Sequence, residues 1–209
     1  MNASHPHTGS GSTDDLDKAA WRRRIGAGRA AVSAQQQVSE ANALTASVRE
    51  LVGDLTEPTV CCYVPFGTEP GSIGVLDVLR EAGARVLLPV IPDERAPLDW
   101  SEYTGTSSLV PGPYRGVLEP GGPRLGAEAI GDAAIVFVPA LAVDRHGARL
   151  GRGAGYYDRS LVFARDDARL IAVVRDDELV ERLPAEPHDV RMSAALTPGN
   201  GVVPLAGTA

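Results

Sequence analysis

Cysteine, lysine and long apolar runs are all scarce in this chain of 209 residues. The only cysteines, Cys61 and Cys62, are adjacent, so a disulfide between them would be strained and a metal site would lack partner ligands. We expect two buried free thiols. No apolar stretch approaches the roughly 20 residues of a bilayer-spanning helix, and the polar segment before Trp21 lacks the apolar region of a secretory signal. These absences predict a cytoplasmic protein with no membrane partner.

Net positive charge is also missing, because the formal charge is −7 at pH 7. This balance argues against broad nucleic-acid binding, which normally needs a basic face. Of the 20 lysine and arginine residues, only Lys18 is a lysine. A lysine suits a phosphate oxygen approached end-on, but a single surviving lysine is equally compatible with compositional drift toward arginine.

The chain predicts one domain with a short tail. Residues 1–12 are rich in Ser, Gly and His and are expected to be disordered. Residues 13–209 show no repeat and are long enough for a single core. Helices are predicted over 13–32, with a cationic face, and over 35–52, with apolar residues at helical spacing.

Beyond these two helices, short β-rich runs alternate with helical segments, which is typical of an α/β fold. Strands are predicted over 59–65, 85–91, 133–138 and 170–175, helices over 72–82, 155–164 and 177–183, and two short strands over 100–104 and 116–118 in a segment rich in Pro and Gly. The predicted fold class is therefore α/β, a single domain with a mostly parallel sheet, helices on both faces and two leading helices.

The segment 138–161 follows an apolar strand and opens a helix, where open α/β sheets bind their ligands. Gly151, Gly153 and Gly155 form a turn whose amides can converge on phosphate oxygens. The spacing matches neither a Walker A loop nor a dinucleotide motif. The surrounding arginines are Arg145, Arg149, Arg152 and Arg159. The segment predicts an anion cradle, although a glycine turn alone is equally compatible with a structural role.

Asp158 lies one helical turn beyond Ala154, so its carboxylate is expected near bound phosphates, where Mg²⁺ takes one or two carboxylates. The alternative is an acid that simply favours the first turn of a helix. Tyr156 and Tyr157 either shape a pocket wall or pack in the core. Of the two histidines outside the tail, His146 is expected in a hairpin turn. His188 is expected at the surface or in contact with the site residues without touching the ligand.

The run Leu150–Asp158 (LGRGAGYYD), preceded by Val138–Asp144 (VPALAVD) and Gly147, resembles the signature of the 5-formyltetrahydrofolate cyclo-ligase family, also called methenyltetrahydrofolate synthetases. The resemblance covers most of the chain after residue 14. It implies a monomeric enzyme that uses ATP and Mg²⁺ to cyclise 5-formyltetrahydrofolate to 5,10-methenyltetrahydrofolate, releasing ADP and phosphate. In the implied mechanism the formyl oxygen is phosphorylated and N10 then attacks the formyl carbon.

The resemblance also implies roles for individual residues. Lys18 and Arg22, four apart on one helical face, resemble a basic pair that reaches the ATP phosphates. The implied catalytic residues are Lys18, Arg152 and Asp158. The implied ATP-binding residues are Lys18, Arg22, Arg149, Leu150, Gly151, Arg152, Gly153, Ala154, Gly155, Tyr156 and Tyr157.

On the folate side, Tyr63–Glu69 (YVPFGTE) resembles a segment that lines the substrate pocket. The implied substrate-binding residues are Val64, Glu69, Arg152, Gly153, Ala154, Gly155 and Tyr156. Pro184 with His188 and Asp189 resembles the segment that supplies a second metal carboxylate, so Asp158 and Asp189 are the implied Mg²⁺ ligands. Gly116–Pro120 resembles a Gly-Ile-x-Glu-Pro element and is expected to be architectural.

Two features depart from the family pattern. Pro70 and Gly71 replace ordinary helix formers, and Ala154 stands where some relatives have lysine. Three rival functions remain: a paralogue acting on another substrate, such as a thiamine-related one, a non-catalytic nucleotide-binding regulator, and a sugar-phosphate or CoA-type binding module. The pocket around Glu69 and Tyr114 would decide between substrates, whereas loss of the carboxylate pair would favour the regulator.

Overall fold

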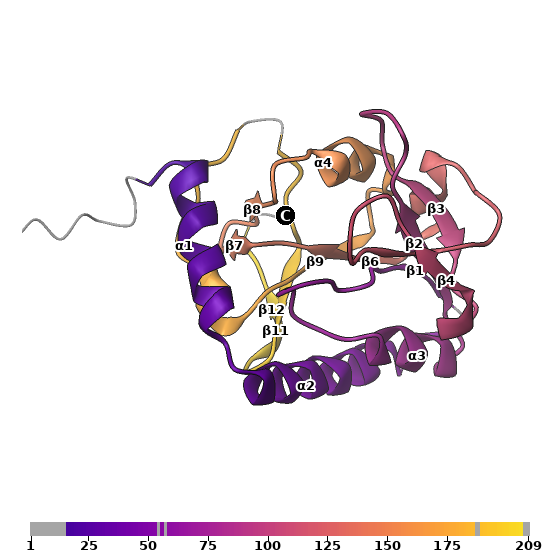
Figure 1. Ribbon diagram of the computed structural model, residues 1–209, viewed down its shortest axis with the longest axis horizontal. Coiled ribbons are helices and arrows are strands. Elements are labelled where there is room, and N and C mark those ends of the chain that lie inside the picture. The colour runs from indigo at the N-terminus through magenta and orange to yellow at the C-terminus, as the bar shows by residue number, and fades with distance from the viewer. Residues whose placement is uncertain (1–15, 54, 57, 187–188, 207–209) are drawn as a thin grey trace, which may run out of the picture.

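The centre of the protein is a seven-stranded sheet with the order β12-β11-β9-β6-β1-β2-β3 (Figure 1). The computed structural model describes residues 16–53, 55–56, 58–186 and 189–206. The strands are β1 (Thr59–Cys61), β2 (Arg85–Val90), β3 (Asp99–Glu102), β6 (Ile135–Pro139), β9 (Arg169–Val173), β11 (Ala194–Thr197) and β12 (Gly201–Pro204). The five inner strands are parallel, and β3 and β12 pair antiparallel at the edges. The predicted α/β class is confirmed.

Both faces of this sheet are covered, but by unequal layers. The helices α2 (Ala34–Val52) and α3 (Gly74–Glu81) lie along one face (Figure 1) and bury Leu44 and Leu76 against it. The other face packs against α4 (Tyr156–Ser160) and 3₁₀ turns over 127–132 and 161–163. Because successive strand residues point to opposite faces, Cys61 joins this second core and Cys62 the first. Both thiols are free and buried, as expected.

The first helix, α1 (Lys18–Ala31), lies at one side of the molecule beside a small sheet (Figure 1). That sheet has the order β10-β7-β8, formed by β10 (Leu179–Val180), β7 (Ala142–Asp144) and β8 (Arg149–Leu150). Trp21 and Ile25 pack on it with Leu150. Asp17 caps the helix by accepting a hydrogen bond from the Ala20 amide. The helix therefore begins at Lys18 and not at residue 13 as predicted.

A hairpin of β4 (Leu109–Pro111) and β5 (Leu118–Pro120) completes the fold, and three predictions need correction. The strand predicted over 59–65 ends at Cys61, and the helix predicted over 155–164 becomes 3₁₀ after Ser160. The helix predicted over 177–183 is wrong. There, Leu179 and Val180 pair with β7, and tertiary pairing overrides the helical pattern of the sequence.

The tail predicted over residues 1–12, together with Asp14 and Asp15, lies outside the described residues. Within the described ranges, no helix is both long and apolar enough to cross a bilayer.

Candidate functional site

A cavity of about 260 Å³ opens where the parallel strands end. It is bounded by the residues that follow β1, β2 and β6, by the β4–β5 hairpin and by the loop that leads into α4. Open α/β sheets bind ligands at the carboxyl ends of their strands. Of the predicted site residues, those that line the cavity are Val64, Glu69, Arg149, Gly151, Arg152, Gly153, Ala154, Gly155, Tyr156, Tyr157 and Asp158.

The glycine loop between β8 and α4 depends on its lack of side chains. Gly153 and Gly155 have φ values of 101° and 72°, in the left-handed region that favours glycine. A Cβ on Gly151 would lie 2.8 Å from the Arg149 Nη1 atom. The backbone therefore favours glycine at 153 and 155, whereas a side chain at 151 would have to displace the Arg149 guanidinium, and the glycines leave the main chain of the loop open to the cavity.

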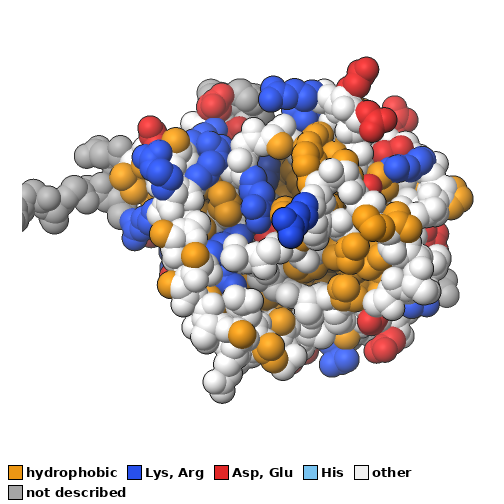
Figure 2. Space-filling model, in the orientation of Figure 1, with side chains coloured by type: hydrophobic (Ala, Val, Ile, Leu, Met, Phe, Trp, Pro, Cys, Tyr) orange, Lys and Arg blue, Asp and Glu red, His pale blue; other side chains and the backbone are white. Residues whose placement is uncertain are grey.

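Two arginines of the loop region are paired with carboxylates in the cavity. Arg152 Nε lies 3.0 Å from Glu69 Oε1, and its guanidinium stacks 4.6 Å from the centre of the Phe66 ring. Arg149 Nη2 lies 2.5 Å from Asp158 Oδ1. Figure 2 shows Lys and Arg side chains gathered on this face, beside apolar surface. An anionic ligand would meet these cations despite the negative net charge of the chain.

Glu69 holds the Arg152 side chain from a buried position. Its side chain is 6% exposed, and it also accepts a hydrogen bond from the Phe66 amide. Burial raises the pKa of Glu69, whereas the Arg152 guanidinium and the Phe66 amide act in the opposite direction. The departure noted at Pro70 and Gly71 has not displaced Glu69 from the cavity.

The two α1 cations reach the edge of the site and not the cavity itself. Arg22 Nε donates to the Gly151 carbonyl at 3.0 Å, so it touches the glycine loop from behind. Lys18 Nζ lies 3.2 Å from Glu186 Oε1 and 3.4 Å from Asp189 Oδ2. Leu150 is buried against α1, so only its main chain could meet a ligand.

The expected metal ligands occupy different surroundings. Asp158 lines the cavity, whereas Asp189 does not and lies beside Lys18. No group of three or more His, Cys, Asp or Glu side chains suited to a metal occurs among the residues that the structure describes. The pair of Asp158 and Asp189 therefore stays a prediction, and His188 lies outside the described residues.

The two tyrosines of α4 fulfil both roles considered for them, because each lines the cavity and packs on the core beneath. The Tyr157 hydroxyl is buried without a hydrogen-bond partner among the described residues. The Tyr156 hydroxyl lies 3.2 Å from that of Tyr114 on the β4–β5 hairpin. The hairpin thus reaches α4 across the mouth of the cavity.

Asp144, the last residue of the Val138–Asp144 motif, stabilises a buried turn. Asp144 is 2% exposed and accepts hydrogen bonds from the amides of His146, Ala148 and Leu183. His146 lies in the hairpin turn between β7 and β8, as predicted. A Cβ on Gly147 would lie 2.5 Å from the Met192 carbonyl oxygen. These residues shape the segment that carries Arg149 into the cavity.

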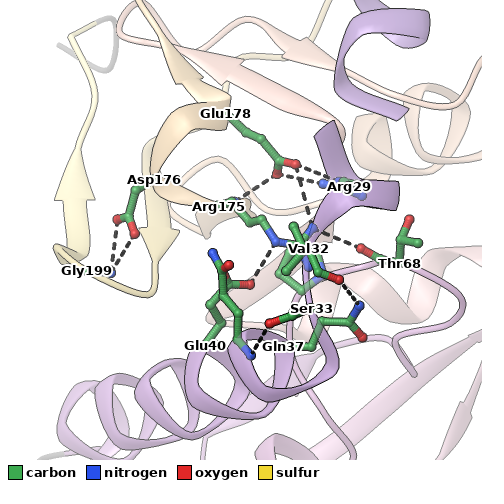
Figure 3. Close-up of polar contacts among 12 residues, drawn as sticks. Arg29, Val32, Ser33, Gln37, Glu40, Thr68, Arg175, Asp176, Glu178 and Gly199 are labelled. Carbon is green, nitrogen blue, oxygen red and sulfur yellow. Dashed lines mark hydrogen bonds and ion pairs between the residues drawn. The ribbon is translucent and has the colours of Figure 1, made fainter. Parts of the chain in front are cut away.

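Sequence reasoning missed a buried ionic network that joins α1 and α2 to the segment that follows β9 (Figure 3). Arg29 donates to both oxygens of Glu178, at 2.6 and 2.7 Å, and to the Ala140 carbonyl at 2.7 Å. Arg175 Nε lies 2.7 Å from Glu40, and its Nη1 donates to the Thr68 carbonyl. A signal was available for Arg29, since it continues the buried stripe of Trp21 and Ile25 at helical spacing.

Comparisons with known proteins agree on one family. Residues 14–198 match the model of the 5-formyltetrahydrofolate cyclo-ligase family. The 5-formyltetrahydrofolate cyclo-ligase of Mycolicibacterium smegmatis is 58% identical over 151 residues, covering 70% of this chain and 77% of the relative. The enzyme of that name from Escherichia coli strain K12 is 31% identical over 142 residues, covering 67% and 78%.

A solved structure supports the same assignment. The NMR structure of the 5,10-methenyltetrahydrofolate synthetase of Aquifex aeolicus aligns with a TM-score of 0.70 and 25% identity, covering 90% of this chain and 92% of that one. The range that the family model matches, 14–198, includes the glycine loop, the cavity arginines and both α1 cations. This chain belongs to the 5-formyltetrahydrofolate cyclo-ligase family.

Proposed function

We propose that the protein uses ATP to cyclise 5-formyltetrahydrofolate to 5,10-methenyltetrahydrofolate, with release of ADP and phosphate. The observation that carries this proposal is the composition of one cavity. It is lined by a glycine loop with Arg149 and Arg152 and also by apolar side chains such as Ile91 and Leu118. Such a cavity suits a phosphate chain beside a flat aromatic ring. The M. smegmatis relative, at 58% identity, bears the name of this activity.

The proposed chemistry explains why the site holds cations and amides, and it needs no nucleophilic side chain. A formamide carbonyl is a poor electrophile, and its oxygen is a poor leaving group. Transfer of the γ-phosphoryl group to that oxygen, with ADP leaving, makes an imino-phosphate. N10 of the same molecule then attacks the formyl carbon, and phosphate departs with the former formyl oxygen. Catalysis of this kind needs mainly positioning and charge neutralisation.

The cations would act by exchanging protein carboxylates for phosphates. Arg152 is half-exposed although Glu69 is buried, so the rest of its guanidinium can meet a ligand while Nε stays bonded to Glu69. Arg22 touches the Gly151 carbonyl and would support the loop around the phosphates. Lys18 would complete the charge at the edge of the site, with Arg149 at its floor.

Mg²⁺ is part of the proposal, and Asp158 and Asp189 would hold it. Carboxylate oxygens are the ligands that Mg²⁺ takes together with phosphate oxygens, and Asp158 stands at the rim of the cavity with its side chain 59% exposed. When bound, the ion supplies charge neutralisation on the phosphates. The side chains Val64, Glu69 and Tyr156 would contact the folate. We also propose a cytoplasmic monomer, which size-exclusion chromatography and cell fractionation would test.

The test is the appearance of product absorbance on mixing the protein with 5-formyltetrahydrofolate and MgATP. We expect an ATP-dependent rise that is lost in Asp158→Ala and kept in Asp166→Ala, an exposed aspartate outside the cavity. Nucleotide binding with no rise would favour a regulator or a paralogue with another substrate. A rise without ATP would contradict the proposed phosphorylation.

A further inference from the structure

Glu119 is a buried carboxylate in the wall of the cavity, and no cation among the described residues pairs with it. It is 6% exposed, is carried by β5 and lines the same cavity as the glycine loop. One oxygen, Oε1, accepts a hydrogen bond from the Ile91 amide at 2.9 Å. No other hydrogen bond and no ion pair of Glu119 is formed with the residues that the structure describes. A carboxylate removed from water normally keeps a charged partner or several donors.

The unbonded oxygen of Glu119 still has open space beside it. The buried side-chain atoms without partners, among the described residues, are Arg29 Nη1, Trp100 Nε1, Ser101 Oγ and Tyr157 Oη. Glu119 Oε2 is not one of them although it makes no hydrogen bond, so some of its surface is accessible. Since the side chain lines the cavity, this surface faces the cavity.

The rest of this end of the cavity is apolar. The neighbouring residues that line it are Pro89, Ile91, Leu98, Val117 and Leu118. The hairpin also fits closely around Glu119, because a Cβ on Gly112 would lie 3.0 Å from the Glu119 carboxyl carbon. A single carboxylate held rigidly in an apolar slot selects a flat ring that presents donors at one edge.

We infer that Glu119 recognises the 2-amino-4-oxopyrimidine edge of the pterin ring, an inference that rests on the proposed function. That edge presents N3–H and the 2-amino group side by side, and the two can donate to a carboxylate as a guanidinium does. Each carboxylate oxygen accepts two hydrogen bonds, so Oε1 can keep the Ile91 amide. Glu119 is then a specificity-determining residue, and the Gly116–Pro120 element is not merely architectural.

The same carboxylate would orient the two substrates relative to each other. Adenine places an acceptor nitrogen beside its amino group, so a carboxylate repels part of its edge. The pterin therefore takes the apolar end, and the ATP phosphates take the end with Arg149 and Arg152. Guanine presents the same two donors as a pterin, so guanosine serves as a second probe of the slot.

The experiment is titration calorimetry with folic acid, guanosine and ATP on the full chain. Glu119→Gln keeps an oxygen for the Ile91 amide but loses the charge and one acceptor. We expect it to weaken folic acid binding by about 10- to 100-fold and to leave ATP binding unchanged. Glu128→Gln, at an exposed position outside the cavity, is the control and should change neither. Matching melting temperatures would show that the variants are folded.

The outcomes separate this inference from the proposed function. Unchanged folic acid binding in a folded Glu119→Gln would overturn the inference, even if the native protein forms the methenyl product. Folic acid binding that depends on Glu119, in a native protein that does not turn over, would support the inference and contradict the proposed function. Guanosine binding as tight as folic acid and equally lost in Glu119→Gln would overturn the assignment to the pterin. Absence of folic acid binding in the native protein would overturn the inference, whereas the proposed function is decided by the product assay alone.

Discussion

Two sets of ion pairs in this protein differ in their exposure. In the network behind α1, Arg29 and Glu178 have side-chain exposures of 1% and 2% and are bonded at both carboxylate oxygens. In the cavity, Arg152 is 48% exposed against a buried Glu69, and Asp158 is 59% exposed against a buried Arg149. Each cavity pair thus has one fixed partner and one partner that can turn away.

The difference shows how one type of interaction serves two purposes. Removing one member of a buried ion pair strongly destabilises a protein, because the remaining charge stays buried without compensation. A half-exposed pair contributes little to stability and is screened by solvent. The network fixes the position of α1 against the sheet, whereas the cavity pairs keep cations available for phosphates. The following predictions test that distinction.

The largest effect is expected from Arg29→Met. It leaves the buried Glu178 with only the more distant Arg175 guanidinium, 3.9 Å away, and we expect the free energy of unfolding to fall by about 3–5 kcal/mol. Arg23→Met, at an exposed position of the same helix, is the matched control and should change it by less than about 0.5 kcal/mol. Urea denaturation measures both. Equal stability of the two variants would contradict the role assigned to the network.

A second member of that network allows a stricter test. Pairing Arg29→Met with Glu178→Met removes both charges, so we expect the double variant to recover most of the stability lost in Arg29→Met alone. The coupling between the two sites, measured by a double-mutant cycle in urea, should be large. A simply additive loss would mean that packing, and not charge, holds α1.

Arg152→Gln should have the opposite effect, with a small loss of stability and a large loss of activity. Because Arg152 is half-exposed, the loss of stability is expected to stay below about 1 kcal/mol, whereas kcat/KM falls by about 100-fold through loss of a transition-state contact. Steady-state kinetics and urea denaturation of the same preparation measure the two quantities. Arg165→Gln, at the surface away from the cavity, is the control. A large stability loss with intact turnover would place Arg152 with the structural pairs.

Glu69 should make stability depend on pH in the mildly acidic range. Its pKa is raised in the folded state, so the folded protein binds the proton more tightly than the unfolded chain. This contribution is fully present below the unfolded pKa and is lost as pH rises through the folded pKa. Glu69→Gln should remove that loss, as measured by urea denaturation across this range. Arg152→Gln should move the window to higher pH, because Arg152 opposes the shift.

The smallest effect concerns the buried thiols. Burial raises the pKa of Cys62 to about 12, so almost no thiolate is present at neutral pH. We expect a thiol reagent to modify neither Cys61 nor Cys62 in the folded protein, and to modify both in urea. Fast modification under native conditions would show that the core around β1 opens readily.

Local patterns carried much of the fold. The apolar strands, the α2 spacing and the glycine loop are short-range signals, and the structure confirms the elements that they predict. The helix predicted over 177–183 failed because its residues pair with β7, which is distant in sequence. The strands β11 and β12 and those of the small sheet were missed for another reason, since each is only two to four residues long and leaves little local pattern.

The sequence by itself determined the family, the loop rich in glycine and arginine, and the two adjacent free thiols, because these depend on residue type and local spacing. Only the tertiary structure decided that Arg29 meets Glu178 across 149 positions, that Glu69 holds Arg152, and that Glu119 faces the cavity. Burial and charge pairing are properties of residues brought together from distant segments. The chemistry of a carboxylate follows from what surrounds it after folding, and the sequence does not specify those surroundings locally.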